Sequence, residues 1–254
     1  MERMQKIATP LAAIVVFLAL WEFVVWIYGW PTYKMAAPSD LPAAFWKFRT
    51  MFIDMGWQTL WRTVLGLGLA VIFGTLLGMA MGFSRVARDA LYPLLVGFNA
   101  VPKATLVPVI ALIFIGQHDF NTVLLAFLIS FFPIAVSVGI GLSTLEPEYR
   151  DILAALGASK LTIFRKIALP KTLPEFFGAL KVSVTLAFIG TNLVEIVSPH
   201  GRGLGALFLS GQINSDYPLM FAVLIALGLL GIVLYYAVVA LEKIFAGWAE
   251  REAH

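Results

Sequence analysis

The chain contains no cysteine among its 254 residues. This absence excludes disulfide bonds, thiolate metal sites and a thiol nucleophile. Two other signals of a catalytic site are also missing. No His/Asp/Glu cluster has metal-ligand spacing, and no Gly-Lys-Ser/Thr phosphate loop occurs. We therefore expect no catalytic residue, no metal and no cofactor in this chain, so any nucleotide hydrolysis must belong to another subunit.

Charged side chains are also scarce. They make up 13% of the residues, against roughly 25% in an average soluble domain, whereas 60% of the residues are hydrophobic. A soluble core of this length could not bury so much apolar surface, which argues against a water-soluble enzyme. The 18 bases are spread along the chain, so no nucleic-acid interface is expected. The composition predicts a polytopic membrane protein, which we expect to be all-α.

Apolar runs of about 20 residues, the length that crosses a bilayer as a helix, occur six times. The expected spans are residues 7–28, 60–83, 91–115, 122–142, 173–197 and 219–245. Pro93, Pro102 and Pro108 interrupt the third run, which predicts a broken helix. The first run is too long for a signal peptide and ends in interfacial aromatics, so we interpret it as an uncleaved anchor.

The distribution of Lys and Arg predicts the orientation. With six spans, eleven of these residues fall on the side of the two termini and five on the other, Arg62 among the five. Because cytoplasmic loops carry the excess of bases, both termini are expected in the cytoplasm. Lys103 and Lys181 fall inside spans, where we expect Lys181 to pair with an acid or to extend toward the interface.

Two segments are expected outside the membrane. Ser39 or Asp40 can cap a helix in the first segment. Its apolar residues recur every three or four positions, as in an amphipathic helix on the outer surface: Ala44, Phe45, Phe48, Phe52 and Ile53. The second segment, 198–218, is rich in glycine and is expected to be looped or partly re-entrant. The chain then forms one membrane domain, with the anchor and outer helix in 1–57 and the core spans in 58–245.

The long cytoplasmic loop 146–170 mixes bases with aliphatic and aromatic residues. Gly157 fits a helix end with a tight backbone, Ser159 can cap a second short helix, and Pro170 is expected to stop that helix before the next span. Exposed apolar residues on a basic loop favour a docking surface for another protein. The alternative is an amphipathic loop that rests on the membrane.

The loop resembles the EAA loop of ABC importer permeases. Asp151 stands where that family usually has Glu, and Gly157, Ile167, Leu169 and Pro170 match the family spacing, although Ile152 and Leu153 replace two alanines. The resemblance implies that residues 158–164 form the coupling helix, which sits in a cleft of the ATPase subunit. It assigns ATPase coupling to Asp151, Gly157, Ala158, Ser159, Lys160, Leu161, Phe164, Ile167, Leu169 and Pro170.

Other stretches extend the resemblance over nearly the whole chain: Trp21-Glu22, Pro38-Ser39, Val101-Pro102-Lys103 and Gly201-Arg202-Gly203-Leu204-Gly205. They look like the nitrate/sulfonate/taurine branch of these permeases, which have the type I, MetI-like fold. The branch implies two permease copies in the bacterial inner membrane, two ATP-binding cassette subunits that hold Mg-ATP, and a periplasmic or lipid-anchored binding protein. In addition, membrane lipid surrounds the spans.

Polar residues inside the spans are candidates for the passage, because each needs a partner or water. Lys103 lies at the expected break of the third span, with Asn99 one turn before it. It can meet an anionic solute, hold a free carbonyl or pair with an acid. Asn192 and Glu195 share a face near the outer end of the fifth span, where Glu195 belongs to an outer gate, to its polar support or to the interface. Glu22 is expected to be a structural or interfacial carboxylate.

A lysine in the passage favours a small anion, namely a sulfonate such as taurine, nitrate or an aromatic carboxylate such as phthalate. The same class of importer carrying a pyrimidine precursor of thiamine or riboflavin is the alternative. A more distant alternative is a secondary transporter that couples to ions through Glu22, Lys103 and Glu195.

Overall fold

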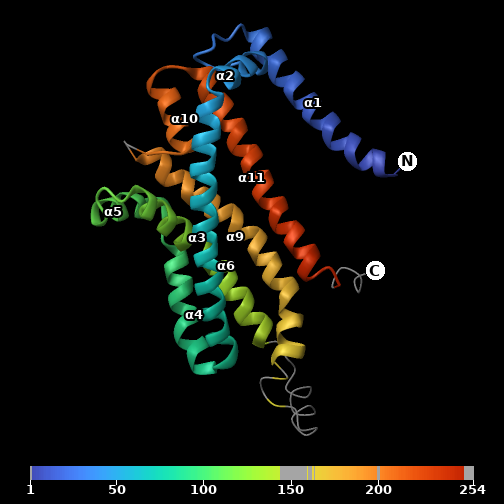
Figure 1. The fold of residues 1–254 in the computed structure, drawn as a ribbon, viewed down its shortest axis with the longest axis vertical. Coiled ribbons are helices and arrows are strands. Elements are labelled where there is room, and N and C mark those ends of the chain that lie inside the picture. The colour runs from blue at the N-terminus through green and yellow to red at the C-terminus, as the bar shows by residue number, and fades with distance from the viewer. Residues whose placement is uncertain (1, 144–158, 160–161, 163, 199–200, 249–254) are drawn as a thin grey trace.

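The computed structural model describes residues 2–143, 159, 162, 164–198 and 201–248, and this part of the chain contains helices and turns but no strand (Figure 1). Among the described residues, four helices are long and apolar enough to cross a membrane. They are α3 (Arg49–Phe83), α6 (His118–Ser143), α9 (Leu169–Val197, preceded by the π turn Phe164–Ala168) and α11 (Tyr217–Phe245). These helices cover four of the six predicted spans.

The other two predicted spans take a different form. The third consists of α4 (Arg85–Ala100) and α5 (Leu106–Ile113), which join through the turn Lys103–Thr105 and are bent by 76°. Helix α1 (Glu2–Tyr28) corresponds to the first, but its apolar part, Ala12–Tyr28, is shorter than the others. The count of six spans and the cytoplasmic location of both termini therefore remain predictions.

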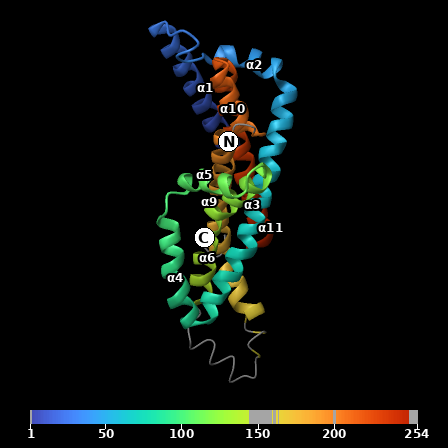
Figure 2. The ribbon, with the colours of Figure 1, turned by 90° about the vertical axis from the view of Figure 1, so that its left-hand side faces the viewer.

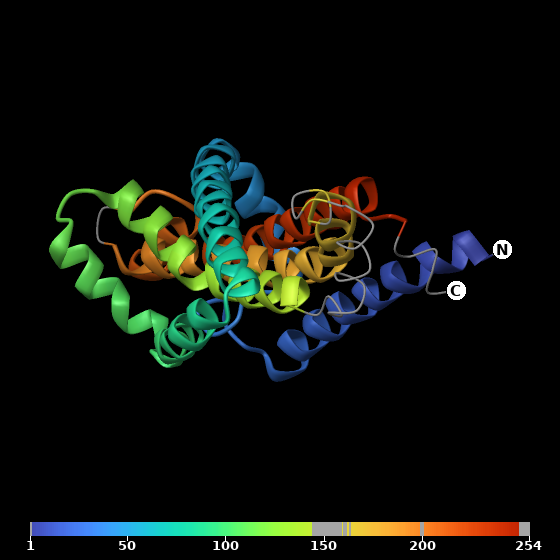
Figure 3. The same ribbon diagram turned by 90° about the horizontal axis from the view of Figure 1, so that it is seen from below.

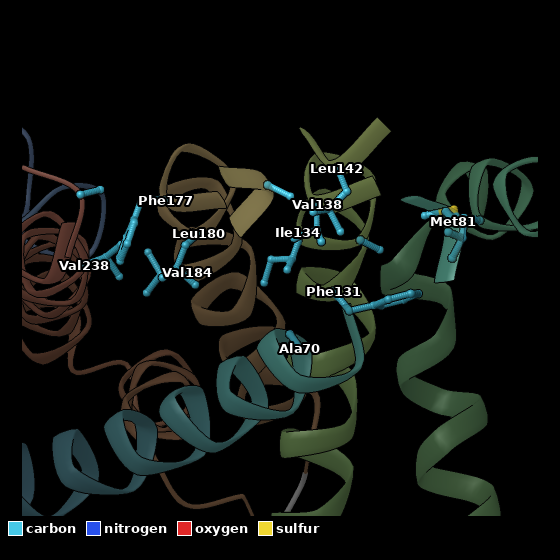
Figure 4. Packing of buried hydrophobic residues seen from close by; sticks show 14 of the residues in the cluster. Ala70, Met81, Phe131, Ile134, Val138, Leu142, Phe177, Leu180, Val184 and Val238 are labelled. Carbon is cyan, nitrogen blue, oxygen red and sulfur yellow. The ribbon is translucent and has the colours of Figure 1, made fainter. Parts of the chain in front are cut away.

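The centre of the bundle is α6, which packs against α3 on one side and α9 on the other. Figure 4 shows the buried cluster, in which Phe131, Ile134 and Val138 of α6 lie between Met81 of α3 and Leu180 of α9. The approach of α3 to α6 is close because small residues recur every fourth position along α3: Gly66, Ala70, Gly74 and Gly78. Such a stripe lets two helix backbones meet, which is how helices commonly associate in lipid.

Gly78→Ala is expected to destabilise this packing. A Cβ atom at Gly78 would lie 2.6 Å from Val138 Cβ and 2.7 Å from the carbonyl oxygen of Ala135, so the helices must separate. We expect a loss of about 1–3 kcal/mol, the usual cost of overpacking. Gly68→Ala is the matched control, because no atom lies within 4 Å of its Cβ position. Thermal unfolding in detergent should rank Gly78→Ala below the parent and Gly68→Ala at or above it.

At the outer end of the bundle, the structure differs from the sequence expectation in two segments. The amphipathic stretch is split between α2 (Leu41–Lys47) and the start of α3, which runs on unbroken into the second span. Its apolar residues pack against α1, α10 and α11 except Ile53, which is exposed. The segment expected to be looped contains a ten-residue helix, α10 (Leu204–Ile213), which packs against α11, α9 and α3, and Figure 2 shows it at the same end of the bundle as α2.

Of the two candidate caps, Ser39 and Asp40, only Asp40 bonds to a free amide at this helix start. The Asp40 carboxylate accepts from the backbone N–H of Ala37 at 3.1 Å, which closes the 3₁₀ turn Pro38–Asp40 ahead of α2. Ser39 instead donates its hydroxyl and its backbone N–H to Glu22 at 2.8 and 3.0 Å. Glu22 is thus a structural carboxylate that ties α1 to the outer segment, while the rest of α1 diverges from the bundle (Figure 3).

Candidate functional site

A buried ion pair joins α3 to α9 near the outer end of the bundle. The side chains of Arg62 and Glu195 are 1% and 0% exposed, and an Arg62 Nη donates to Glu195 Oε1 at 3.2 Å. The same guanidinium donates through Nε to Asp119 at the start of α6, at 2.9 Å. One arginine therefore holds three helices together, in a setting where an unpaired charge would be costly.

The Glu195 carboxylate also holds the beginning of α10. Glu195 Oε2 accepts from the Thr59 hydroxyl at 2.8 Å and from the backbone N–H of Gly205 at 3.1 Å. The Thr59 hydroxyl in turn accepts from the backbone N–H of Leu204 at 2.8 Å. A carboxylate at a helix N-terminus is favourable because it satisfies free amide groups and faces the positive end of the helix dipole. We call Thr59, Arg62, Asp119, Glu195 and the N-terminus of α10 the outer polar network.

Two glycines make this arrangement possible. Gly203 has φ of +131°, and a Cβ atom there would lie 2.1 Å from the Glu195 carboxylate. A Cβ atom at Gly205 would lie 2.8 Å from Glu195 Cβ. Between the helices, the Arg202 carbonyl accepts from the Arg62 guanidinium, and the Arg202 N–H donates to His118 Nε2 at 3.3 Å. The glycine-rich stretch is thus shaped to fit around the carboxylate.

The predicted passage residues separate into different surroundings. Glu195 has no exposed surface, which places it in a polar support rather than on a wall. Asn192 lies one turn before it, as expected, and donates to the Phe188 carbonyl at 2.8 Å. Sequence reasoning missed Arg62 and Asp119, since it counted Arg62 among outer loop charges. The sequence feature that could have indicated a buried Arg62 is its position three residues after Thr59, just inside the apolar run 60–83.

Lys103 and Asn99 meet at the break between α4 and α5. The Lys103 ammonium donates to the Phe98 carbonyl and to Asn99 Oδ1, each at 3.2 Å, and to the Asn99 carbonyl. Lys103 therefore binds carbonyl oxygens that are left free at the end of α4, which is one of the three roles expected from the sequence. The surrounding residues 99–102 and 104–105 are exposed, and irregular backbone at membrane depth has to face protein or water.

One face of helix α9 is exposed and includes polar and small residues. The exposed residues recur at intervals of three or four along one side: Glu175, Gly178, Val182, Thr185 and Ile189. We call them the α9 stripe. Leu186 and Leu193 pack against a buried cluster that includes Val107 and Ile110 of α5, and α11 also packs against α9. By contrast, the exposed face of α3 carries six large apolar side chains: Val64, Leu65, Leu69, Ile72, Phe73 and Leu76.

A second ion pair lies beside the α9 stripe. Lys181 Nζ is 2.7 Å from Glu242 Oε2 on α11, with the two side chains 26% and 15% exposed. Of the two expectations for Lys181, an extension toward the interface or a pair with an acid, the structure shows the pair, with a partner on α11 that was not foreseen.

The coupling loop is described only in part. Asp151, Gly157, Ala158, Lys160 and Leu161 lie outside the described residues, as does the side chain of Phe164. Ser159 Oγ accepts from the Thr162 backbone N–H at 3.2 Å, as expected of a helix cap. The π turn that contains Ile167 leads directly into α9 at Leu169, so Pro170 does not separate a loop helix from the span. Pro170 is the second residue of α9, directly after the π turn.

Comparison with known proteins decides the family. The model of binding-protein-dependent transport system inner membrane components matches residues 70–247. The chain belongs to this family. It is thus the permease subunit of a binding-protein-dependent ABC importer, a multi-pass membrane component that is not itself an enzyme.

Relatives of the permease cover almost its full length. It is 29% identical to the formylaminopyrimidine transport permease of Halalkalibacterium halodurans, over 99% of this chain and 100% of that one. It is 30% identical to the riboflavin permease of Chloroflexus aurantiacus, over 92% and 88%, and 26% identical to a bicarbonate permease of Synechocystis, over 96% and 91%. A chain of the inward-facing MetNI methionine ABC transporter shares its fold, with a TM-score of 0.64, 19% identity, and coverage of 78% and 98%. The expected MetI-like fold is confirmed.

Proposed function

We propose that the permease works as two copies in a bacterial cytoplasmic membrane, with the solute passage between them. In this proposal, residues 1–254 form one permease domain with both termini in the cytoplasm. Two ATP-binding cassette subunits hold the Mg-ATP and bind the loop 146–170, so this chain needs no cofactor. A periplasmic or lipid-anchored binding protein delivers the solute at the outer end.

The α9 stripe is the observation that supports a passage on this face. Glu175 and Thr185 are poor contacts for lipid, whereas the exposed face of α3 is well suited to it. Helix α5 contacts α9, and the exposed residues 99–102 and 104–105 lead into α5. A second copy facing this surface would cover the irregular backbone and leave room for water.

The coupling residues are proposed to move α9. The described part of the loop, from Phe164 onward, continues without a break into α9. A displacement of the loop by the ATPase would therefore be carried into the α9 stripe as a rigid movement. The outer polar network would carry the same movement to α3, α6 and α10, because it bonds all of them to Glu195 or Arg62.

For the solute, we favour a small heterocycle. Relatives that carry formylaminopyrimidine and riboflavin support this choice, and the Lys103 ammonium is engaged by carbonyls rather than facing a solute. A small anion is the second candidate because of the bicarbonate permeases. ATP-driven uptake of each solute by vesicles that contain the permease, the ATPase and the binding protein separates the two.

Single cysteines can test the passage, because the chain has none of its own. In the assembled complex in lipid nanodiscs, Ile189→Cys on the α9 stripe should react with a charged methanethiosulfonate reagent. Ile72→Cys on α3 is the matched control, since the two parent side chains are 46% and 56% exposed. It should react at least about tenfold more slowly, because both the thiolate and the reagent need water.

Equal reaction rates at the two positions would contradict the passage on α9. Uptake driven by an ion gradient, in vesicles without any ATPase subunit, would instead favour a secondary transporter.

A further inference from the structure

A groove of about 490 Å³ lies on the surface between α9 and α11, next to the Lys181–Glu242 pair. Five α9 residues and Tyr235 of α11 line it: Gly178, Lys181, Val182, Thr185, Leu186 and Tyr235. Three of the α9 residues, Gly178, Val182 and Thr185, belong to the α9 stripe. The groove therefore opens onto the face that we propose as the passage wall.

Helical spacing places the groups of each helix on one face of that helix. Gly178, Lys181, Val182 and Thr185 follow one another at three- and four-residue steps on α9, so they share a face. Tyr235 and Glu242 are seven residues apart on α11, which is two helical turns, and therefore also share a face. The 2.7 Å ion pair joins the two faces along one edge of the groove.

The surface suits a flat ring with polar edges. Tyr235 is 39% exposed and offers an aromatic face, while Gly178 leaves open space because no atom lies within 4 Å of its Cβ position. Lys181 supplies N–H donors, and the Glu242 carboxylate is an acceptor that can take two hydrogen bonds. The Thr185 hydroxyl donates to the Lys181 carbonyl at 3.3 Å, which leaves its oxygen free to accept.

The paired charges also argue against a simple anion. The two side chains are mostly shielded from water, and an anion that captured Lys181 would leave Glu242 without its partner. A neutral solute with both donors and acceptors can bond to both members while the pair stays together. An aminopyrimidine edge, which offers an N–H donor beside a ring nitrogen acceptor, has this character.

We propose that this groove is a solute site of the permease, in which Tyr235 stacks on a planar heterocycle and Lys181 and Glu242 bond to its edge. The inference rests on the proposed passage, since it requires the α9 stripe to face water. It makes these three residues determinants of solute choice within the membrane, in addition to any selection by a binding protein.

Protection of a nearby cysteine tests the site. In the complete complex in nanodiscs, Val182→Cys is labelled with the charged thiol reagent in the presence of 4-amino-2-methylpyrimidine or of benzoate. We expect the pyrimidine to slow labelling and benzoate, a planar anion, to have no effect. Glu242→Gln should raise the half-protecting concentration of the pyrimidine about tenfold, because it loses a charged acceptor. Tyr235→Leu should raise it about fivefold or more through lost stacking, with the ion pair intact.

The Tyr235→Leu variant separates a solute site from a structural ion pair, since it does not touch the pair. Thermal unfolding and retention of the ATPase subunits check that each variant is assembled. Absence of protection by the pyrimidine, or equal protection by benzoate, would overturn the inference even if Ile189→Cys reacts as expected. Failure of Ile189→Cys to react would instead count against the passage itself.

Discussion

Arg62→Met is expected to lower the free energy of unfolding by about 3–5 kcal/mol, because it leaves the buried Glu195 carboxylate without its cation. The side chain of Glu195 is 0% exposed, so water cannot replace the lost partner. The Arg202 carbonyl also loses its donor, so one of the bonds between α3 and the segment before α10 is lost. In a protein of this size the melting temperature should fall by about 10 °C. Thermal unfolding of the purified permease in mild detergent measures the change.

The matched control is Arg49→Met, at the exposed start of the same helix. The Arg49 guanidinium donates to the Trp46 carbonyl at 3.2 Å and lies over the Trp46 ring, contacts that are open to solvent. We expect its loss to cost less than about 1 kcal/mol. The double variant Arg62→Met with Glu195→Leu should regain part of the stability, since Asp119 is 62% exposed and can be hydrated. Equal melting temperatures for Arg62→Met and Arg49→Met would show that the network is not a stabilising core.

Local sequence patterns predicted the long spans well, because helix length and apolarity are properties of a single segment. They were less successful where two patterns meet. No proline separates the second part of the amphipathic stretch from the second span, so α3 joins residues 49–53 to that span in one 35-residue helix. Of three prolines in the third span, only Pro102 coincides with the break, whereas α4 continues through Pro93 and Pro108 falls in the first turn of α5.

The outer polar network could not be derived from the sequence in the same way. Arg62 bonds to residues 57 and 133 positions away, and no local spacing indicates such partners. The glycines of the α9–α10 connection were visible, and they suggested a loop. Their role depends instead on the Glu195 carboxylate, which occupies the space where their side chains would lie. Glycine in this segment lets the backbone approach the buried Glu195 carboxylate closely. Helix α10 then begins in contact with that carboxylate.

Gly157→Asp is expected to abolish transport while the permease remains inserted in the membrane. By resemblance, Gly157 is the tight turn before the coupling helix, where an added side chain would misplace the helix and its charge would be desolvated against the ATPase. ATP-driven uptake should fall by at least about tenfold, since loss of a central contact at an interface commonly costs 2 kcal/mol or more. Uptake by reconstituted vesicles and co-purification of the ATPase subunit with the permease give the two measurements.

Val86→Asp provides the control for Gly157→Asp, because it introduces the same carboxylate at another turn that we expect in the cytoplasm. Val86 is 79% exposed at the start of α4 and lies outside the coupling loop. Its variant should keep both transport and the bound ATPase. Leu161→Asp, within the proposed coupling helix, should behave like Gly157→Asp although it leaves the glycine turn intact. If Gly157→Asp and Leu161→Asp both retain the ATPase and transport at the parent rate, the loop 146–170 is not the site through which the ATPase drives the permease.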